Sequence, residues 1–399
     1  MSNKKVLFIS GSLGLGHVGR DLVIAQHLRQ LCPGANISWL AAHPATDFLV
    51  NAGEKLAPEV AGYANDNDAA EKAAENGRLN LLKYLTIARK AWKQNVKVFA
   101  ETTSRERFDL TIGDETYEIS VALSKNPNLK KTPFVMIYDF IGLDSMTSSP
   151  LERLGIYIWN RTWATTDKNG TISDLNLFIG EKEDIPDKPF GFMLPNRRDW
   201  AQQRCQFVGY VIPFDPNEYT DQLKVKAQLG YAREQPLIIS SVGGSAAGKP
   251  LLEIFGKTYP LIKDRLGDLR MILVCGPRIR TESIVVPQGV EVMGYVPDLY
   301  KHFAASDLSL VMGGGTSTLE LTVLKRPFIY FPLEEHCEQE LNVATRLERH
   351  RSGVRMSYSK TTPEILAEKI IANIGKEVDY ASVPTDGGKK SAELISKFL

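Results

Sequence analysis

Short apolar runs alternate with helical patterns along this chain, and the whole scheme occurs twice. The runs expected to form strands are residues 5–10, 37–41, 110–113 and 134–138, and then 237–241, 271–275, 290–293, 308–312 and 328–331. Helical spacing lies between them, at residues 20–31, 79–104 and 118–124 in the first half and 251–263, 299–304, 318–325 and 340–349 in the second. This alternation is typical of parallel sheets joined by right-handed helical crossovers. The sequence therefore predicts an α/β fold.

The length of the chain favours two domains, because 399 residues are too many for one ordinary hydrophobic core. Two prolines and a glycine interrupt the pattern at residues 207–217, which we expect to be the linker. We expect a Rossmann-like domain at residues 1–208, a second at 209–380, and a C-terminal helix at 381–399 that crosses back to the first. Parallel sheets bind ligands beyond the carboxyl ends of their strands, so we expect two domains facing each other across a cleft.

Composition excludes several classes of partner. The chain has 48 Lys and Arg against 47 Asp and Glu, so no overall field attracts nucleic acid or an anionic membrane. The four cysteines are widely separated and no pair has metal-ligand spacing. The first apolar run is too short for a signal peptide, and no run approaches the roughly 18 apolar residues of a membrane span. We expect a cytoplasmic enzyme with no nucleic-acid partner.

A glycine-rich segment, MGGGTSTLE, runs from Met312 to Glu320 between an expected strand and an expected helix. Its glycines let the backbone approach a ligand, and the start of the helix offers free N–H groups and a positive dipole end to a phosphate. Thr316, Ser317 and Thr318 add hydroxyl donors. Glu320, one turn into the helix, would accept both hydroxyls of a ribose. The segment predicts a site for a sugar linked to a nucleotide diphosphate; a tight turn without a ligand is the alternative.

A second glycine-rich loop follows the first expected strand and ends in His17. With an ordinary pKa near 6.5, a histidine there can take a proton from a hydroxyl at neutral pH. Asp114 directly follows another strand, so it is expected on the same sheet edge, where it would fix the tautomer of His17. The alternatives are a structural histidine and a helix-capping aspartate. Arg20 binds an anion or pairs with a carboxylate, and Glu115 and Asp139 are weaker candidates for the same edge.

A third glycine loop, SSVGGSAAGK at residues 240–249, follows the strand 237–241 and repeats the anion-binding arrangement. It is not a P-loop, because Pro250 stands where that motif needs a Ser or Thr to bind magnesium. It also lacks the G-x-G-x-x-G spacing of a dinucleotide fingerprint.

Taken together, these motifs resemble those of a known family. The chain is similar to glycosyltransferases of the two-Rossmann-domain type called GT-B, close to the MurG-type GlcNAc transferases and the UDP-glycosyltransferases. GGSAAG at residues 243–248 resembles the GGS-type loop of the MurG-like C-terminal domain. GYVPDLYKHFAASDLSLVM at 294–312, followed by GGGTSTLE, resembles that domain's donor signature. The resemblance covers nearly the whole chain.

The resemblance implies roles for the matching positions. His17 corresponds to the catalytic base and Asp114 to its partner. The backbone around Tyr295 and Val296 would meet the base of the nucleotide, Glu320 the ribose, and the acidic-Gln pair with its following Asn the donor sugar. The full set of expected donor-binding residues is Gly14, Gly16, Gly243, Gly244, Ser245, Tyr295, Val296, Gly313, Gly314, Gly315, Thr316, Ser317, Glu320, Glu338, Gln339 and Asn342.

The chain departs from the family at Met312, where relatives carry a histidine or an arginine. A charged phosphate contact is therefore missing at that position. We expect backbone, hydroxyls, or a cation from elsewhere such as Lys249 or Arg278 to hold the diphosphate.

The function that follows is an inverting, metal-independent hexosyl transfer from a nucleotide-diphosphate sugar, by resemblance a UDP-sugar, to an unidentified acceptor hydroxyl. No cofactor and no metal ligand are expected; the carboxylates at residues 66–68 are interpreted as a solvated loop. Two alternatives stay open. One is a UDP-sugar hydrolase of the pseudaminic-acid-pathway type, which uses water as the acceptor, and the other is a sugar-nucleotide-binding subunit without catalysis.

Two surface features have competing interpretations. The basic helix at residues 78–107 either docks on an anionic bilayer, as a peripheral membrane contact, or is a solvated face over a core stripe. The aromatic residues Tyr157, Trp159, Trp163 and Phe178, together with residues 190–194, either line an acceptor pocket or belong to the core.

Overall fold

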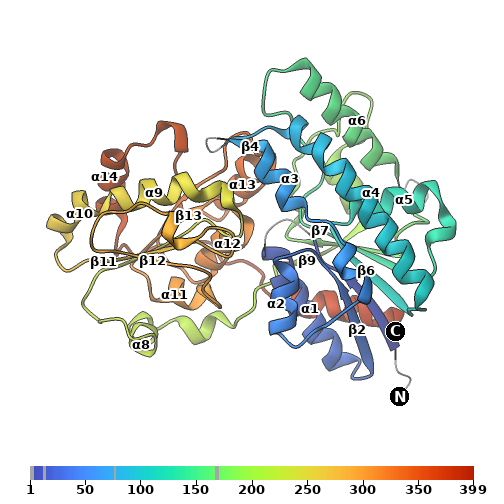
Figure 1. Ribbon diagram of the computed structural model, residues 1–399, viewed down its shortest axis with the longest axis horizontal. Coiled ribbons are helices and arrows are strands. Elements are labelled where there is room, and N and C mark those ends of the chain that lie inside the picture. The colour runs from blue at the N-terminus through green and yellow to red at the C-terminus, as the bar shows by residue number, and fades with distance from the viewer. Residues whose placement is uncertain (1–3, 12–14, 76–77, 167–169) are drawn as a thin grey trace. The chain divides into compact units, whose positions relative to one another are not determined.

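The computed structural model describes residues 4–11, 15–75, 78–166 and 170–399. The chain forms two compact units (Figure 1). The N-terminal domain comprises Met1–Lys72, Leu81–Pro213 and Pro384–Leu399, and the C-terminal domain comprises Ala73–Asn80 and Phe214–Val383. The chain thus passes between domains at Pro213, and its last helix belongs to the first domain.

The N-terminal domain is built on a parallel sheet of seven strands in the order β3-β2-β1-β6-β7-β8-β9. The strands are β1 (Lys4–Ile9), β2 (Ala35–Leu40), β3 (Lys55–Leu56), β6 (Leu110–Asp114), β7 (Phe134–Tyr138), β8 (Leu175–Ile179) and β9 (Cys205–Gly209). β6 and β7 are buried along their whole length. This explains why they appear in the sequence as short continuous apolar runs.

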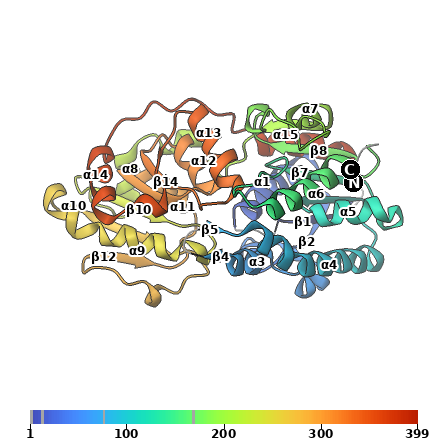
Figure 2. The same ribbon diagram turned by 90° about the horizontal axis from the view of Figure 1, so that it is seen from above.

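Helices cover both faces of this sheet (Figure 2). One core contains side chains of α4 (Leu81–Arg105), α5 (Tyr117–Lys125), α6 (Pro150–Thr166) and α7 (Arg197–Arg204). The other contains side chains of α1 (Gly16–Leu31), α2 (Ala45–Asn51) and α15 (Gly387–Ile395). The terminal helix α15 packs against α1, which ties the end of the chain to its beginning.

The C-terminal domain has a parallel sheet of six strands in the order β12-β11-β10-β13-β14-β15. They are β10 (Leu237–Ser241), β11 (Arg270–Val274), β12 (Val290–Met293), β13 (Leu308–Met312), β14 (Phe328–Phe331) and β15 (Val354–Arg355). On one face lie α9 (Lys249–Lys257), α10 (Tyr259–Leu266) and α14 (Pro363–Asn373). On the other lie α8 (Gln222–Gln228), α11 (Leu299–Ala305), α12 (Gly315–Val323) and α13 (Ala344–Arg349).

Each sheet reverses its strand order at one point, and this decides where ligands can bind. The N-terminal sheet grows outward from β1 to β2 and β3, and then returns to place β6 beside β1. The C-terminal sheet grows from β10 to β11 and β12 and returns to place β13 beside β10. At such a point the loops after the two neighbouring strands run in opposite directions, which opens a crevice at the carboxyl edge. The third glycine loop follows β10 and MGGGTSTLE begins at the end of β13, so both lie at this point of the C-terminal sheet.

Several sequence expectations need correction. Residues 66–68 are not a loop, because α3 (Asp66–Ala73) begins there. The helix expected at 251–263 is two helices, since Thr258, whose hydroxyl donates to the carbonyl of Phe255, separates α9 from α10. The helix expected at 340–349 begins earlier as a π-helical turn, Glu338–Val343, before α13. β8, β9 and β15 were not anticipated, and β9 occupies the first part of the expected linker.

A short hairpin from the first half of the chain belongs to the C-terminal domain. Its strands are β4 (Ala74–Glu75) and β5 (Arg78–Leu79). The amide of Leu79 donates to the carbonyl of Glu334 at 2.9 Å, and Arg78 Nε lies 3.3 Å from the Glu334 carboxylate. Backbone pairing therefore makes these residues part of the second domain.

Arg197 anchors the loop that follows β7 in the N-terminal domain. Its side chain is 3% exposed and makes two 2.9 Å bonds to Asp144 and one of 2.7 Å to the carbonyl of Leu143. Lys188 also pairs with Asp144 at 2.9 Å, so removing Arg197 leaves this carboxylate with one cation but without the buried hydrogen bonds that fix the loop. We therefore expect Arg197→Met to destabilise the domain by about 2 kcal/mol.

The loss of stability in Arg197→Met is measured as a lower midpoint of the N-terminal domain's transition in thermal and urea unfolding. Arg153→Met, at an exposed position of α6, is the matched control and should change stability by less than about 0.5 kcal/mol. Equal stabilities of the two variants would contradict the anchoring role.

Candidate active site

His17 and Asp114 lie side by side at the carboxyl edge of the N-terminal sheet. His17 is in the first turn of α1, which follows β1, and Asp114 is the last residue of β6. Because β1 and β6 are neighbours, the two side chains meet, and Nδ1 lies 2.8 Å from Oδ2 of the fully buried carboxylate. A Cβ atom at residue 11 would lie only 3.0 Å from the ring, so Gly11 leaves the space that the imidazole occupies.

Arg20, one turn later on α1, binds the same carboxylate. Its Nη2 lies 2.5 Å from Asp114 Oδ1 and its Nη1 lies 2.5 Å from Asp139 Oδ2. Nη2 also lies 2.8 Å from Nδ1 of His17, but this group already donates to Asp114 Oδ1. The carboxylate of Asp114 only accepts, so Nδ1–H of His17 donates to it, and Nε2 of the neutral ring keeps the free lone pair.

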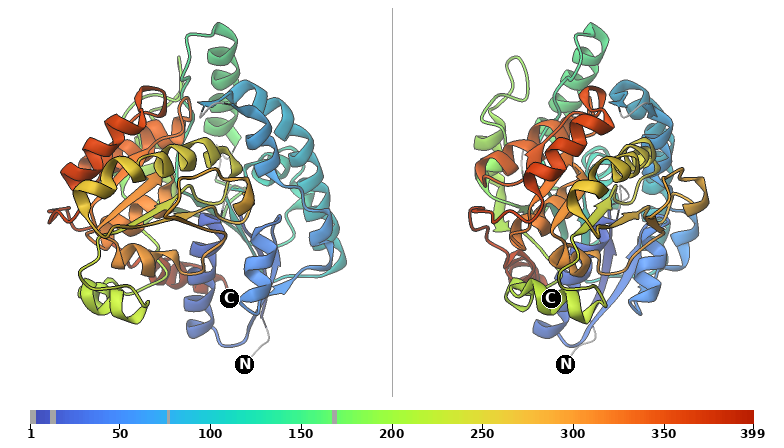
Figure 3. Two further views of the ribbon diagram at one scale, coloured as in Figure 1. Left: turned by 60° about the vertical axis from the view of Figure 1, so that its left-hand side comes forward. Right: turned by 90° about the vertical axis from the view of Figure 1, so that its left-hand side faces the viewer.

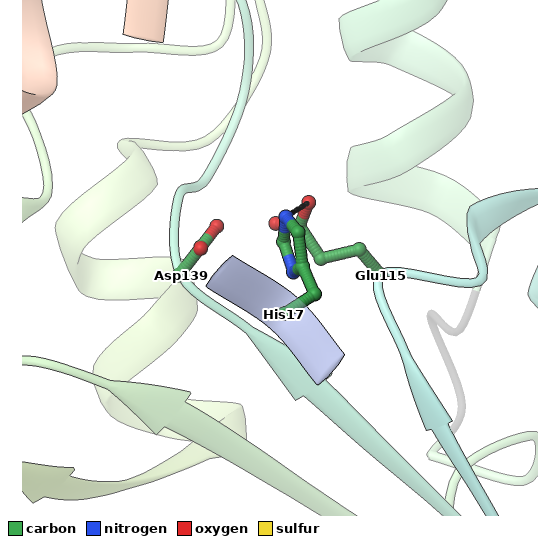
Figure 4. Close-up of side chains that lie close together, drawn as sticks. All are labelled: His17, Glu115 and Asp139. Carbon is green, nitrogen blue, oxygen red and sulfur yellow. Dashed lines mark ion pairs between the residues drawn. The ribbon is translucent and has the colours of Figure 1, made fainter. Parts of the chain in front are cut away.

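Nε2 faces further carboxyl groups. Figure 4 shows His17 between Glu115 and Asp139, and Glu115 Oε2 lies 3.7 Å from Nε2. The hydroxyl of Tyr117 donates to Glu115 Oε1 at 3.0 Å, which holds that carboxyl in place. The backbone of Glu115 has φ of 52°, in the left-handed region that non-glycine residues rarely adopt. Such conformations persist where the surroundings demand them, as at binding sites.

The charges of this cluster follow from burial and from Arg20. Burial lowers the pKa of His17, but the charge and hydrogen bond of Asp114 outweigh it, so the pKa is raised above its usual 6.5. Burial raises the pKa of Glu115 well above its usual range, and the charges of Asp139 and Asp114 add to this. Burial opposes ionisation of Asp139 too, yet Arg20 brings its pKa well below the usual range. The surroundings thus favour the ionised forms of Asp114 and Asp139 and the protonated form of Glu115.

His17, Glu115 and Asp139 each offer one ligand atom within 4.8 Å of the others, which is the spacing of a metal site. Arg20 already binds one oxygen of Asp139, and its fixed positive charge would lie beside any cation there. The donor set therefore fits proton transfer and hydrogen bonding better than it fits a divalent cation.

MGGGTSTLE lies where the sequence predicts it, between β13 and the start of α12. A Cβ at Gly313 would lie 2.8 Å from the Pro332 backbone, so this glycine permits a close packing of two loops. A Cβ at Gly314 or Gly315 would meet nothing closer than 3.9 Å, so there is room for a ligand beside this part of the backbone. The hydroxyl of Thr318 is not available to a ligand, because it donates to the carbonyl of Gly314 at 2.8 Å. The exposed hydroxyl at the helix start belongs to Thr316, with Ser317 half-buried beside it.

Glu320 is 8% exposed on α12, and burial together with the charge of Asp298 raises its pKa to about 8. It is therefore mostly protonated at neutral pH. A neutral carboxyl can both donate to and accept from a diol, and it does not repel a nearby phosphate.

The remaining expected donor-binding residues lie after other strands of the same sheet. Gly243, with φ of 74°, and Gly244 follow β10, and Ser245 caps the short turn after them by accepting from the amide of Ala247. Tyr295 and Val296 follow β12, and the Tyr295 side chain is 42% exposed. All of these loops leave the carboxyl edge of one parallel sheet.

The acidic-Gln pair starts the π-helical turn after β14. Gln339 is buried, and its Oε1 accepts from the amide of Leu333 at 2.9 Å, which leaves its NH2 group to donate to a ligand. Burial lowers the pKa of the adjacent His336 to about 4, so this ring is neutral. Glu338 and Asn342 are half-buried in the same turn. In the first loop, Gly16 begins α1, while Gly14 lies outside the described residues.

Sequence reasoning missed Arg346. It lies one helical turn beyond Asn342, and its Nη2 donates to the carbonyl of Gly315 at 2.7 Å and to Oγ1 of Thr318 at 3.2 Å. A cation at the start of α12 reinforces the positive end of the helix dipole rather than opposing it, an arrangement suited to an anion. Its position four residues after Asn342 in a helix is the signal that could have found it.

Most of the aromatic residues considered as an acceptor pocket pack in the hydrophobic core. Phe178 is fully buried, and Trp163 packs on Tyr117 with ring centroids 4.5 Å apart. Trp159 packs on Trp92 of α4 at 5.1 Å. The core interpretation therefore holds for these three, and Tyr157 packs beside Gly191.

The raised pKa of His17 should depend on Asp114. We expect the His17 imidazole to titrate above 6.5 in the unmodified chain, and Asp114→Asn to lower its pKa by about one to two units because the opposite charge is gone. Nitrogen-detected NMR titration, with His17→Gln to assign the signal, measures this. The raised pKa also means that this pair stabilises the fold below pH 6.5 and that the contribution is lost as pH rises through the folded-state value.

Asp187→Asn, at an exposed carboxyl, is the control and should leave the His17 titration unchanged. A His17 pKa that is the same in both variants would show that Asp114 does not set it.

Comparison with known proteins agrees with this arrangement. Residues 238–397 match the glycosyltransferase family 28 C-terminal domain. An uncharacterized glycosyltransferase of Methanosarcina acetivorans is 32% identical over 232 residues, which are 55% of this chain and 58% of that protein. A similar protein of Methanosarcina mazei is 28% identical over 232 residues, with the same shares of both chains. The chain thus spans less than two thirds of the length of these relatives.

Solved structures match over the whole chain. The glycotransferase of kitacinnamycin has a TM-score of 0.64 at 14% identity, covering 100% of both chains. MurG of Acinetobacter baumannii has a TM-score of 0.53 at 15% identity, covering 99% of both. The C-terminal domain of this chain thus matches the family 28 C-terminal domain, and the chain as a whole shares the fold of these solved glycosyltransferases, MurG among them.

Proposed function

We propose that this protein transfers a sugar from a nucleotide diphosphate, a UDP-sugar by its similarity to MurG, to a hydroxyl group of an acceptor. The observation that carries this proposal is the set of groups at the β10 and β13 edge: accessible glycine backbone, the start of α12, Arg346 and a neutral Glu320. This set offers positive charge to a diphosphate and a carboxyl to a ribose. One of the structural relatives, the glycosyltransferase VinC, was solved in complex with dTDP.

The donor is held in the C-terminal domain in this proposal. The diphosphate lies at the start of α12, where backbone N–H groups of Gly315 and Thr316 and the guanidinium of Arg346 meet its charge. Arg346 thereby replaces the basic residue absent at Met312. Glu320 binds the ribose, and Tyr295 and Val296 meet the base. Glu338, the NH2 group of Gln339, and Asn342 bind the sugar.

His17 acts as the general base. Its Nε2 takes the proton of the acceptor hydroxyl while the acceptor oxygen forms a bond to the anomeric carbon. The bond between that carbon and the phosphate oxygen breaks, and the diphosphate leaves with the electron pair. Attack opposite the leaving group inverts the anomeric configuration. Asp114 stabilises the imidazolium, as in a catalytic dyad.

No metal or other cofactor is required by this proposal, because Arg346 and the helix start stabilise the charge that develops on the leaving group. Transfer that survives full chelation by EDTA is the expected result.

Arg346 should control nucleotide affinity. We expect Arg346→Met to weaken binding of UDP by about tenfold or more, because the substitution removes a charge-assisted contact to phosphate. Isothermal titration with UDP, dTDP, GDP and uridine measures the change. Uridine lacks the diphosphate, so its affinity should be the same with and without Arg346.

Arg265→Met, at an exposed arginine paired with Glu368, is the matched control and should bind UDP as the unmodified protein does. An equal loss for UDP and uridine would assign Arg346 a purely structural role. Absence of binding to every nucleotide diphosphate would refute the donor site.

His17 should be needed for turnover and not for donor binding. We expect His17→Ala to reduce kcat by about 100-fold to 10,000-fold and to leave UDP affinity unchanged. Because His17 works as a base, kcat/KM should rise with pH through its raised pKa, above 6.5. The assay follows labelled sugar from UDP-glucose or UDP-GlcNAc onto a panel of hydroxyl acceptors.

Gln26→Ala, at an exposed position of α1, serves as the control. Near-normal transfer by His17→Ala would refute the assignment of the base. Fast stoichiometric release of sugar without any acceptor would show that water is the acceptor and would refute the transfer reaction.

A further inference from the structure

The loop that leads from β14 to the acidic-Gln pair, Glu338 and Gln339, decides where that pair lies. The amide of Leu333 donates to Oε1 of Gln339 at 2.9 Å, and the amide of Gln339 donates to Nδ1 of His336 at 3.3 Å. Between them Glu335 has φ of 63°, in the left-handed region that costs a non-glycine residue conformational energy. The loop therefore holds one particular shape, and a change of that shape would move Gln339.

Glu334, in the middle of this loop, is bound by two other segments of the chain. Its carboxylate accepts from the amide of Ser359 at 2.9 Å and from the Ser359 hydroxyl at 2.7 Å, and Nε of Arg78 donates to its other oxygen at 3.3 Å. Its backbone carbonyl accepts from the amide of Leu79 at 2.9 Å. Glu334 is 9% exposed, and burial would raise the pKa of its carboxyl, but Ser359 and Arg78 outweigh burial and lower the pKa. The ionised form of Glu334 is therefore favoured.

One of these two segments, β5, comes from the first half of the chain. Arg78 precedes Glu334 by 256 positions, and the two residues form a parallel bridge. The Leu79 side chain is 6% exposed, so apolar burial supports the backbone bond. The sequence pattern assigns residue 79 to a helix, whereas the helix begins at Leu81. A local pattern does not reveal a pairing partner so far along the chain.

β5 is followed almost at once by a helix of the N-terminal domain. Only Asn80 separates β5 from α4, whose first residue, Leu81, belongs to that domain. In Figure 3 the chain can be followed here where its colour passes from blue towards cyan. No helix in the described part of the chain, α4 included, is long and apolar enough to cross a membrane. The two β5 residues that bind Glu334 are thus joined directly to the domain that carries His17.

We propose that Glu334 is a positioning residue for the donor sugar and that β5 holds it in place. This inference rests on the proposed function, in which Glu338, the NH2 group of Gln339, and Asn342 bind the sugar. A loop that already has its binding shape loses less conformational freedom when the sugar binds, so fixing the loop at Glu334 raises the affinity for the sugar. The diphosphate is bound at the start of α12 in the same proposal. Glu334 therefore affects the sugar and leaves the affinity for UDP unchanged.

A purely structural role of Glu334 would give a different result. If its bonds only stabilised the C-terminal domain, breaking them would weaken the binding of every ligand of that domain to a similar extent. A positioning role confines the loss to ligands that carry the sugar. The ratio of the affinity for a UDP-sugar to the affinity for UDP separates the two roles, because UDP makes the nucleotide contacts and lacks the sugar.

The test is isothermal titration of the full chain with UDP, UDP-glucose, UDP-galactose and UDP-GlcNAc. For the UDP-sugar that the unmodified chain binds most tightly, we expect Glu334→Ala and Arg78→Glu each to weaken binding by about tenfold, and to change UDP affinity by less than about twofold. Glu334→Ala removes the group that accepts from Ser359 and Arg78. Arg78→Glu places a carboxylate beside those of Glu334 and Glu335.

Two further variants control for the chemistry of these changes. Glu334→Gln keeps an oxygen that can accept from Ser359, so it should bind the UDP-sugar to within about threefold of the unmodified chain. Arg265→Glu reverses an arginine of matching exposure, since the side chain of Arg265 is 51% exposed and that of Arg78 is 54% exposed. It should bind all four ligands as the unmodified chain does. Thermal unfolding of each variant checks that it is folded.

Three outcomes would overturn the proposal. They are equal losses of affinity for UDP and for the UDP-sugar, unchanged binding of the UDP-sugar in Glu334→Ala or Arg78→Glu, and binding of UDP without binding of any of the three UDP-sugars. If UDP does not bind either, the proposed donor site is refuted and this inference with it, so the two failures are distinguishable.

Discussion

The chemistry of this protein depends on a constraint of parallel sheets. Every strand of such a sheet ends at the same edge, and the crossover helices carry the chain back to the other edge before the next strand begins. Residues that follow different strands are therefore collected together however far apart they lie in the chain. His17 and Asp114 are 97 positions apart and meet because β1 and β6 are neighbours. The glycine loops at residues 243 and 313 are likewise brought to the β10 and β13 edge by the reversal of strand order.

Burial and neighbouring charges then set the pKa of each carboxyl group at these edges. Asp114 is wholly buried, and such a carboxylate is tolerated only with compensating partners, which are His17 and Arg20. The same Arg20 favours the ionised form of Asp139, whereas burial and the charges of Asp139 and Asp114 raise the pKa of Glu115 and favour its protonated form. A single guanidinium thus divides three neighbouring carboxyl groups into two charged ones and a neutral one. In the C-terminal domain burial, together with the charge of Asp298, raises the pKa of Glu320.

Sequence patterns predicted the strands well because a buried strand is a local property. The strands at residues 134–138, 237–241, 290–293, 308–312 and 328–331 are confirmed at the same bounds. The patterns failed where a feature depends on distant packing. β9, with its polar Gln206, is a strand because it pairs with β8 and not because of its composition. The carboxylates at 66–68, interpreted as a loop for their polarity, begin a helix whose Ala69 and Ala73 are buried.

The sequence by itself determined the α/β alternation and the glycine-lined turns, and it identified His17, Asp114 and Glu320 as candidate site residues. Each of these predictions depends only on residues within a few positions of one another. The tertiary structure alone decided which of these groups share an edge, which carboxyl groups have raised or lowered pKa values, and that Arg346 contacts the start of α12. The physical reason is that these properties depend on strand order and on the exclusion of water, which arise only when segments far apart in the chain pack together.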